Sequence, residues 1–267
     1  EMAVEIALAY GAQGITYTYN EPVVFIEYAY DVGVLAKRQG LFNTMVTNGY
    51  MTDEAIDLVS KFVDALTIDL KGHGDSELAK KLCHVPDVSP VFNAIVELKR
   101  KGVFIEITDL VIPVYGDDLE KARKLARWVV ENLGPETPVH FLRFHPDYKL
   151  LDIPSTPVKV LEKHIEIARE EGLLHVYIGN VPGHQYEHTY CPRCGKAVVK
   201  RLGFDIIEYN LDRDSRCKFC GYKLNIVGGL APTYKADRFV YIPLDLYTEF
   251  IHVPQDKIKS FTLGEHK

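Results

Sequence analysis

Four of the five cysteines in this chain form two Cys-x-x-Cys pairs, a spacing that is typical of metal ligands. The pairs are Cys191 with Cys194 and Cys217 with Cys220; they are separated by 22 residues, and a glycine follows each pair. Each pair can turn both sulfurs toward one cation, and the glycine permits the turn that brings backbone N–H groups to the thiolates. Four thiolates complete a tetrahedral shell, which predicts a structural Zn²⁺ in a ribbon with a hairpin through 198–209. Iron is the alternative metal, and two disulfides are less favoured.

A second set of polar residues stands at the ends of six short apolar runs. Carboxylates, amides and cations follow these runs in turn: Asn20 and Glu21, Thr47 and Asn48, Asp69 and Lys71, Glu106 and Thr108, Arg143 and His145, and Asn180. In parallel α/β folds the carboxyl ends of the strands form one rim, and ligands bind there. The pattern therefore favours an enzyme over a scaffold.

The elements that position these residues alternate between strand and helix. The six runs, at 14–18, 43–47, 65–70, 103–112, 139–144 and 175–179, are rich in β-branched and aromatic residues. Helical periodicity fills 1–10, 23–38, 53–62, 91–101, 119–132 and 157–171. This alternation predicts parallel strands joined by right-handed crossovers. Six strands indicate an open or incomplete barrel, with a doubly wound sheet as the alternative.

The run at 65–70 shows which side chains face the interior of such a barrel. Its period of two puts Leu66, Ile68 and Leu70 on one face and Asp69 and Lys71 on the other. The next run does the same with Glu106 and Thr108. We interpret the polar face as the lining of a wide lumen that holds a polar ligand; the alternative is a set of buried salt bridges without function.

The composition and length of the chain limit which partners it can have. The 267 residues carry a net charge of −6, which argues against nucleic acid or an anionic membrane as the main partner. No apolar run approaches the roughly 20 residues of a membrane span. Free Cys-x-x-Cys pairs predict a reducing compartment, the cytoplasm. We expect a barrel at 1–185, a four-cysteine zinc ribbon at 186–227 and an extension at 228–267.

Taken together, the motifs resemble a known family. They are GITYTYNEP at 14–22, VTNG at 46–49, TIDLKG at 67–72, EITDLVIP at 106–113, PVHFLRFHPDY at 138–148, VYIGNVPG at 176–183 and the two cysteine pairs. This set closely resembles the radical S-adenosylmethionine (SAM) enzymes of the AmmeMemoRadiSam group, which are relatives of pyruvate formate-lyase activating enzymes. The resemblance covers about residues 1–227.

The resemblance implies a partial (β/α)6 radical SAM-type barrel whose first strand is missing here, followed by a C-terminal zinc ribbon. It implies a [4Fe-4S] cluster on a Cys-x3-Cys-x2-Cys loop, bound SAM, and a 5′-deoxyadenosyl radical that abstracts hydrogen from substrate. That loop is absent from this sequence, whose one cysteine outside the pairs is Cys83. We therefore expect that an upstream part is missing before Glu1 and that this fragment alone is inactive.

The resemblance also implies roles for individual residues. Asn20 and Glu21 stand at the place of the Gly-Gly-Glu-Pro motif that receives the SAM ammonium, although Tyr19 and Asn20 replace its two glycines. Thr47 and Asn48 lie where relatives hold the methionyl carboxylate. Asp69 and Lys71 match the Asp-x-Lys pair near SAM. Four further candidates for ribose, adenine or substrate come only from the expectation that they face the lumen: Glu106, Thr108, His140 and Arg143.

Two other functions compete with this interpretation. Lys71 on a barrel strand could form a Schiff base, as in a lyase. The ribbon could bind nucleic acid through a basic face, although nearby acidic residues offset its charges: Lys196, Lys200, Arg201, Arg213, Arg216 and Lys218. The sequence does not specify the substrate, for which a protein partner is one candidate.

Overall fold

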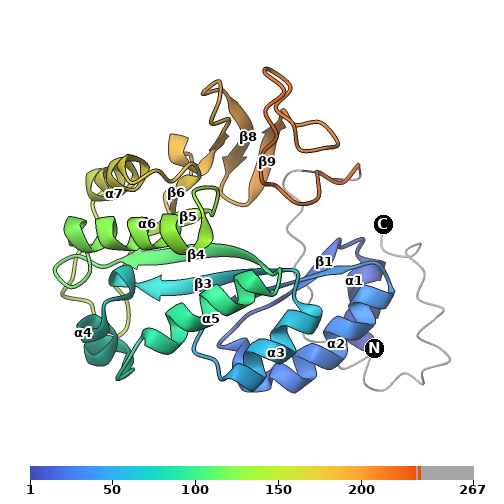
Figure 1. Ribbon diagram of the computed structural model, residues 1–267, viewed down its shortest axis with the longest axis horizontal. Helices are drawn as coiled ribbons and strands as arrows, with labels where there is room; N and C mark the ends of the chain where they lie inside the picture. The colour runs from blue at the N-terminus through green and yellow to red at the C-terminus, as the bar shows by residue number, and fades with distance from the viewer. Residues whose placement is uncertain (233, 236–267) are drawn as a thin grey trace.

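The protein is described from a computed structural model that defines residues 1–232, 234 and 235. Most of the extension expected at 228–267 lies outside these residues. Six parallel strands form one sheet in sequential order (Figure 1). The strands are β1 Gly14–Tyr17, β2 Phe42–Thr47, β3 Ala65–Lys71, β4 Phe104–Val111, β5 Val139–Arg143 and β6 Val176–Gly179. A doubly wound sheet reverses its strand order at a switch point, and this sheet does not. The expected six-stranded parallel α/β architecture is confirmed.

Helices connect successive strands and cover one face of the sheet (Figure 1). Their bounds are α1 Met2–Ala9, α2 Ile26–Arg38, α3 Asp53–Phe62, α5 Ser89–Arg100, α6 Leu119–Leu133 and α7 Val158–Glu170. Side-chain caps fix two of the starts, because Thr52 accepts from Ala55 N and Asp118 accepts from Glu120 N and Lys121 N. Among the described residues no helix is long and apolar enough to cross a membrane.

Alternation along the strands divides the sheet into two faces. In β3, Leu66, Ile68 and Leu70 are at most 5% exposed and pack against the helices. Asp69 and Lys71 point to the other face, and β4 repeats the pattern. We call the face turned away from the helices the inner face. The predicted division of apolar and polar side chains in β3 and β4 is therefore confirmed.

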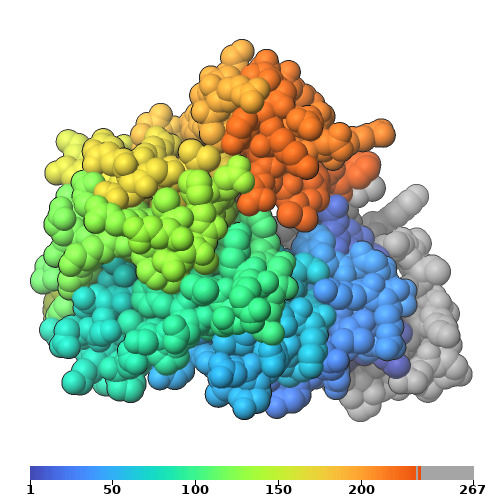
Figure 2. Space-filling view, in the orientation of Figure 1, coloured from blue at the N-terminus to red at the C-terminus, as the bar shows by residue number. Residues whose placement is uncertain are grey.

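The four-cysteine unit, residues 186–227, has a small sheet and core of its own. Its antiparallel strands are β7 Thr189–Tyr190, β8 Ala197–Leu202 and β9 Asp205–Tyr209. The hydrophobic core of this unit has six buried residues: Cys191, Val198, Val199, Leu211, Cys217 and Leu224. In Figure 2 this unit, in orange, stands on the green and yellow side of the barrel that contains α6 and α7.

Two local differences from the expected elements stand out. The helix expected at 23–38 begins as the 3-10 turn η1 Pro22–Phe25 and becomes α-helical only at Ile26. The turns that follow β3 and β4 also meet at two glycines: a Cβ added to Gly116 would lie 2.6 Å from Gly72 Cα. Only residues without side chains permit this approach. Short helical turns then lead to α5: η2 Gly72–Gly74, α4 Ser76–Leu78 and η3 Ala79–Cys83.

Candidate functional site

Glu21 joins the carboxyl ends of the first two strands. It caps η1 by accepting from Val23 N at 3.2 Å. The same oxygen, Oε1, accepts from the Thr47 hydroxyl at 2.6 Å, while Oε2 accepts from Asn48 N at 2.8 Å. Asn48 Oδ1 accepts from Tyr50 N, which leaves the amide Nδ2 as a donor at the same place. The structure thus brings Glu21, Thr47 and Asn48 together around one carboxylate.

An ion pair stands at the end of the neighbouring strand, β3, on its inner face. Lys71 Nζ donates to Asp69 Oδ2 at 2.8 Å, and both side chains are 36% exposed. Because Thr47 pairs with Ile68 in the sheet, the β2 and β3 ends are direct neighbours. The site therefore offers acceptors for an ammonium and donors for a carboxylate at adjacent strand ends, as a zwitterionic ligand requires.

The turn after Lys71 is anchored from the helix side of the sheet. Buried Asp109 of β4 accepts from His73 N at 2.8 Å and also pairs with His73 Nδ1. These contacts hold His73 at φ 66, a left-handed conformation that is uncommon outside glycine. The anchor fixes the direction in which β3 ends and, with it, the position of Lys71.

Farther along the inner face, three strands contribute a second polar group. His140 Nε2 lies 3.0 Å from Glu106 Oε2, and the His140 ring stacks on Tyr177 with 4.7 Å between centroids. Thr108, next to His140 in the sheet, donates to Ile68 O at 3.3 Å. This group continues the row of inner-face side chains from Asp69 to β6.

The surroundings of Glu106 set its charge. Burial alone raises the pKa of this carboxyl, but the hydrogen bond with His140 and the positive charges of His140 and Arg201 outweigh burial. The net result is a pKa below the ordinary value, so Glu106 is ionised at neutral pH. Burial also raises the pKa of the Tyr177 phenol, which therefore stays protonated.

Two predicted site residues do not join these hydrogen-bonded groups. Asn20 is exposed, and no side-chain hydrogen bond of Asn20 occurs among the described residues. Arg143 lies three positions after His140, which places it on the opposite face of β5, and its Nε donates to Thr156 O at 3.0 Å. The structure therefore separates Arg143 from the inner-face group that includes Glu106, Thr108 and His140.

Sequence reasoning did not place Tyr177 or Arg201 at the inner face; Arg201 was named only as part of the basic face of the ribbon. Tyr177 pairs with His140 in the sheet, and the period of β6 could have placed it on the inner face. Arg201 lies 5.8 Å from the Tyr177 ring, measured from Cζ to the ring centroid, although it belongs to the four-cysteine unit. No local pattern signals a contact between such distant segments.

The four paired cysteines converge as predicted. Their sulfurs all lie within 4.8 Å of one another, with Cys191 and Cys220 at 3.5 Å and Cys194 and Cys217 at 3.8 Å. A tetrahedral ion with metal–sulfur bonds of about 2.3 Å requires sulfurs about 3.8 Å apart. Burial favours the protonated Cys217 thiol, but N–H groups of Phe219 and Cys220 outweigh it and lower the pKa to about 7. This geometry fits a single metal ion.

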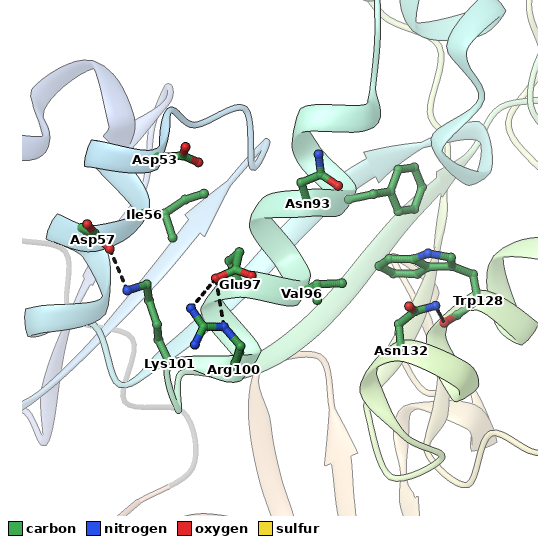
Figure 3. A pocket seen from close by; sticks show the side chains of 11 residues that line it. Asp53, Ile56, Asp57, Asn93, Val96, Glu97, Arg100, Lys101, Trp128 and Asn132 are labelled. Carbon is green, nitrogen blue, oxygen red and sulfur yellow. Dashed lines mark hydrogen bonds and ion pairs between the residues drawn. The ribbon is translucent and has the colours of Figure 1, made fainter.

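A surface groove of about 650 Å³ lies elsewhere, on the helix side of the sheet (Figure 3). It runs between α3, α5 and α6, and Phe92 and Trp128 form an aromatic contact at one end. Its main charges pair with one another: Lys101 with Asp57, and Arg100 with Glu97 (Figure 3). None of the inner-face residues lines this groove. The groove is therefore not part of the candidate site.

Comparison with known proteins agrees with this arrangement. The family model described as Radical SAM superfamily matches residues 1–129. An uncharacterized protein of Methanocaldococcus jannaschii is 46% identical over 228 residues, which cover 85% of this chain and 67% of that protein. The pyruvate formate-lyase-activating enzyme of Clostridium pasteurianum is 27% identical over 168 residues, or 57% of this chain and 68% of that enzyme.

A solved structure shares the fold. A domain of a pyruvate-formate lyase-activating enzyme from Bacteroides vulgatus superposes with a TM-score of 0.55 at 22% identity, over 63% of this chain and 100% of that one. The polar residues of this parallel α/β sheet gather at the carboxyl ends of its strands, which is where such folds bind ligands. More narrowly, the chain belongs to the radical SAM superfamily.

Proposed function

We propose that the inner face binds SAM, with the methionyl end at Glu21, and that the chain is the SAM-binding part of a radical enzyme of the AmmeMemoRadiSam type. One observation carries the proposal: a carboxylate, an amide and an ion pair stand at the carboxyl ends of three consecutive parallel strands. Glu21 is suited to accept the ammonium, because a carboxylate binds a cation by charge-assisted hydrogen bonds. Asn48 Nδ2 and Lys71 Nζ supply donors for the carboxylate of the ligand.

The residues of this chain fit SAM but not the cluster. SAM would supply the sulfonium carbon–sulfur bond that the superfamily cleaves reductively. A [4Fe-4S] cluster needs three thiolates beside that site, whereas four of the five cysteines lie in the four-cysteine unit and Cys83 is exposed. Cluster-dependent chemistry therefore requires cysteines that this sequence does not contain, and activity is not expected from these 267 residues alone. For the four-cysteine unit we propose structural zinc, and for the protein a reducing, cytoplasmic location.

Binding of SAM to the 267-residue chain tests the proposal, by isothermal titration calorimetry. We expect saturable binding that Glu21→Gln weakens by about ten-fold or more, since the amide lacks the charge that attracts the ammonium. Glu27→Gln is the matched control, because Glu27 is exposed in the first turn of α2. Absence of SAM binding, or equal affinities for the Glu21 variant and the parent chain, would refute the assignment.

The lyase alternative receives less support from the geometry. A Schiff base forms from a neutral amine, usually in an apolar pocket. Lys71 instead pairs with Asp69 and is 36% exposed, so it lacks the apolar surroundings that such a lysine needs. Borohydride trapping with pyruvate distinguishes the two functions: a stable adduct at Lys71 would favour the lyase.

The nucleic-acid alternative is weakened because its basic face is partly occupied. Lys200 pairs with Glu208 at 2.6 Å, and Arg201 turns toward Tyr177 of the barrel. Lys218 Nζ donates to Tyr209 O. These contacts leave fewer cations for phosphate groups than the sequence offers.

A further inference from the structure

Arg201 reaches from β8 of the four-cysteine unit toward the last strand of the barrel. One of its terminal nitrogens, Nη1, donates to Glu187 O at 3.0 Å and to the Thr189 hydroxyl at 2.9 Å. Its backbone N–H donates to His188 Nδ1 at 3.2 Å. The guanidinium is therefore held in one orientation, over the Tyr177 ring.

No carboxylate lies within ion-pair distance of Arg201 in the part of the chain that the structure describes. Neighbouring Lys200, on the same strand, does have a partner in Glu208. Both hydrogen bonds of the Arg201 side chain start from Nη1. Neither Nε nor Nη2 makes a hydrogen bond within the part of the chain that the structure describes. The half-buried, oriented guanidinium thus presents Nε and Nη2 of its planar fork without an ion-pair partner among the described residues, although its charge acts on Glu106 from a distance.

The surroundings of this fork are suited to an anion. Tyr177 forms one wall, and its hydroxyl is engaged with Thr189 at 3.1 Å. His140 stacks on the same ring and pairs with Glu106, which limits the repulsion that this carboxylate exerts on an incoming negative charge. Arg201, Tyr177 and His140 lie at the β6 end of the inner face, whereas the proposed methionyl site is at the ends of β1 to β3.

We propose that Arg201, with Tyr177 and His140 beside it, forms a binding site for an oxyanion group of the substrate, a carboxylate or a phosphate, at the β6 edge of the barrel. The four-cysteine unit thereby contributes directly to substrate recognition. Planar bidentate pairing is the interaction that arginine makes best with either group. This anion site adds substrate recognition to the proposed function, and it depends on that function only for the statement that the bound anion belongs to a substrate.

The test is a titration of the full 267-residue chain with sodium phosphate and, separately, sodium acetate at constant ionic strength. The Tyr177 ring signals, followed by NMR, report binding in every variant. We expect a saturable shift with at least one of the two anions, weakened about ten-fold or more by Arg201→Gln. A response to phosphate alone identifies a phosphate-bearing substrate, and a response to acetate alone a carboxylate. SAM is left out, so failure of SAM to bind at Glu21 does not affect the result.

Two further variants make the outcome decisive. Lys200→Gln removes a neighbouring charge that is already paired, so we expect wild-type affinity; an equal loss here would indicate a non-specific basic surface and overturn the proposal. Arg201→Lys keeps the charge but not the fork, and we expect affinity about three-fold or more below that of wild type. Equal affinity of wild type and the lysine variant, or no saturable shift with either anion in wild type, would also overturn it. Metal content of each variant verifies that the four-cysteine unit remains folded.

Discussion

The Thr47 hydroxyl donates to Glu21 Oε1 at 2.6 Å and also accepts from Gly49 N at 3.1 Å. It therefore links the cap of η1 to the turn that follows β2. Glu21 owes its orientation to this bond as much as to its own backbone.

Thr47→Val should weaken SAM binding while leaving the fold in place. The valine keeps the side-chain volume but removes both hydrogen bonds, and we expect a loss of about 1–2 kcal/mol in the free energy of unfolding. With Glu21 less restrained, the Kd for SAM should rise about 3–10-fold by calorimetry. The control is Thr44→Val, which loses a hydroxyl contact with Thr16 lower on the inner face. Equal losses of affinity in both variants would contradict the role of Thr47.

Acid should destabilise the barrel through His164. Burial lowers the pKa of His164 in the folded state, although its bond to Val160 O opposes this effect. The unfolded state then binds a proton more readily, so stability is complete above the ordinary histidine pKa of about 6.5 and falls as pH decreases below it. His164→Leu should reduce the difference in unfolding free energy between about pH 7 and pH 5, as measured by urea denaturation. His145→Leu, at an exposed site, should leave that difference unchanged; if it does not, the loss arises elsewhere.

Asn43 should be among the least replaceable polar residues of the barrel. Its Nδ2 donates to Gly33 O and Phe62 O at 3.0 and 3.1 Å, and its Oδ1 accepts from the Tyr17 hydroxyl at 3.0 Å. Alanine would leave these buried groups unpaired at a cost of about 3 kcal/mol in the free energy of unfolding. Asn93→Ala, on the exposed side of α5, should cost less than about 0.5 kcal/mol. A small effect at Asn43 would mean that water replaces its bonds.

Metal should be required by the four-cysteine unit and not by the barrel. The unit buries few residues, too few for a stable core of its own, so metal binding must supply its folding energy. Elemental analysis of protein purified without added zinc should give about one equivalent of zinc. Less than about half an equivalent of zinc or iron would contradict a metal site at the four cysteines. Iron in place of zinc would support a metal site but identify its metal as iron.

Chelation extends this prediction to the fold. Removing the metal, or introducing Cys217→Ser, should expose the amides of Val198 and Val199 to hydrogen exchange. Amides of Ile105 and Ile107 in the barrel core should stay protected, since a separate hydrophobic cluster holds them. Loss of protection in both places would show that the two parts fold as one unit.

Local patterns predicted the barrel because its strands are regular. The period of two in β3 and β4 was sufficient to assign Asp69 and Glu106 to the inner face, and the paired cysteines were sufficient to predict their convergence. Arg143 shows where this reasoning stops: it was expected to face the lumen together with His140, although three positions along a strand reverse the face.

Contacts between distant segments could not be predicted in this way. Arg201 meets Tyr177 only because the four-cysteine unit docks beside β6, and Asp109 meets His73 only because the turn after β3 folds over the helix side of β4. Neither pairing leaves a periodic trace in the sequence. Such contacts depend on the relative placement of whole elements, which composition and spacing do not encode.

The glycine contact between the β3 and β4 turns has a mechanical consequence. Since the backbones touch at Gly72 and Gly116, neither turn can shift inward without displacing the other. A ligand that displaces Lys71 must therefore displace the neighbouring turn as well, so the two turns move together. Any closing motion over this end of the barrel would be shared, and stiffening one turn would stiffen both.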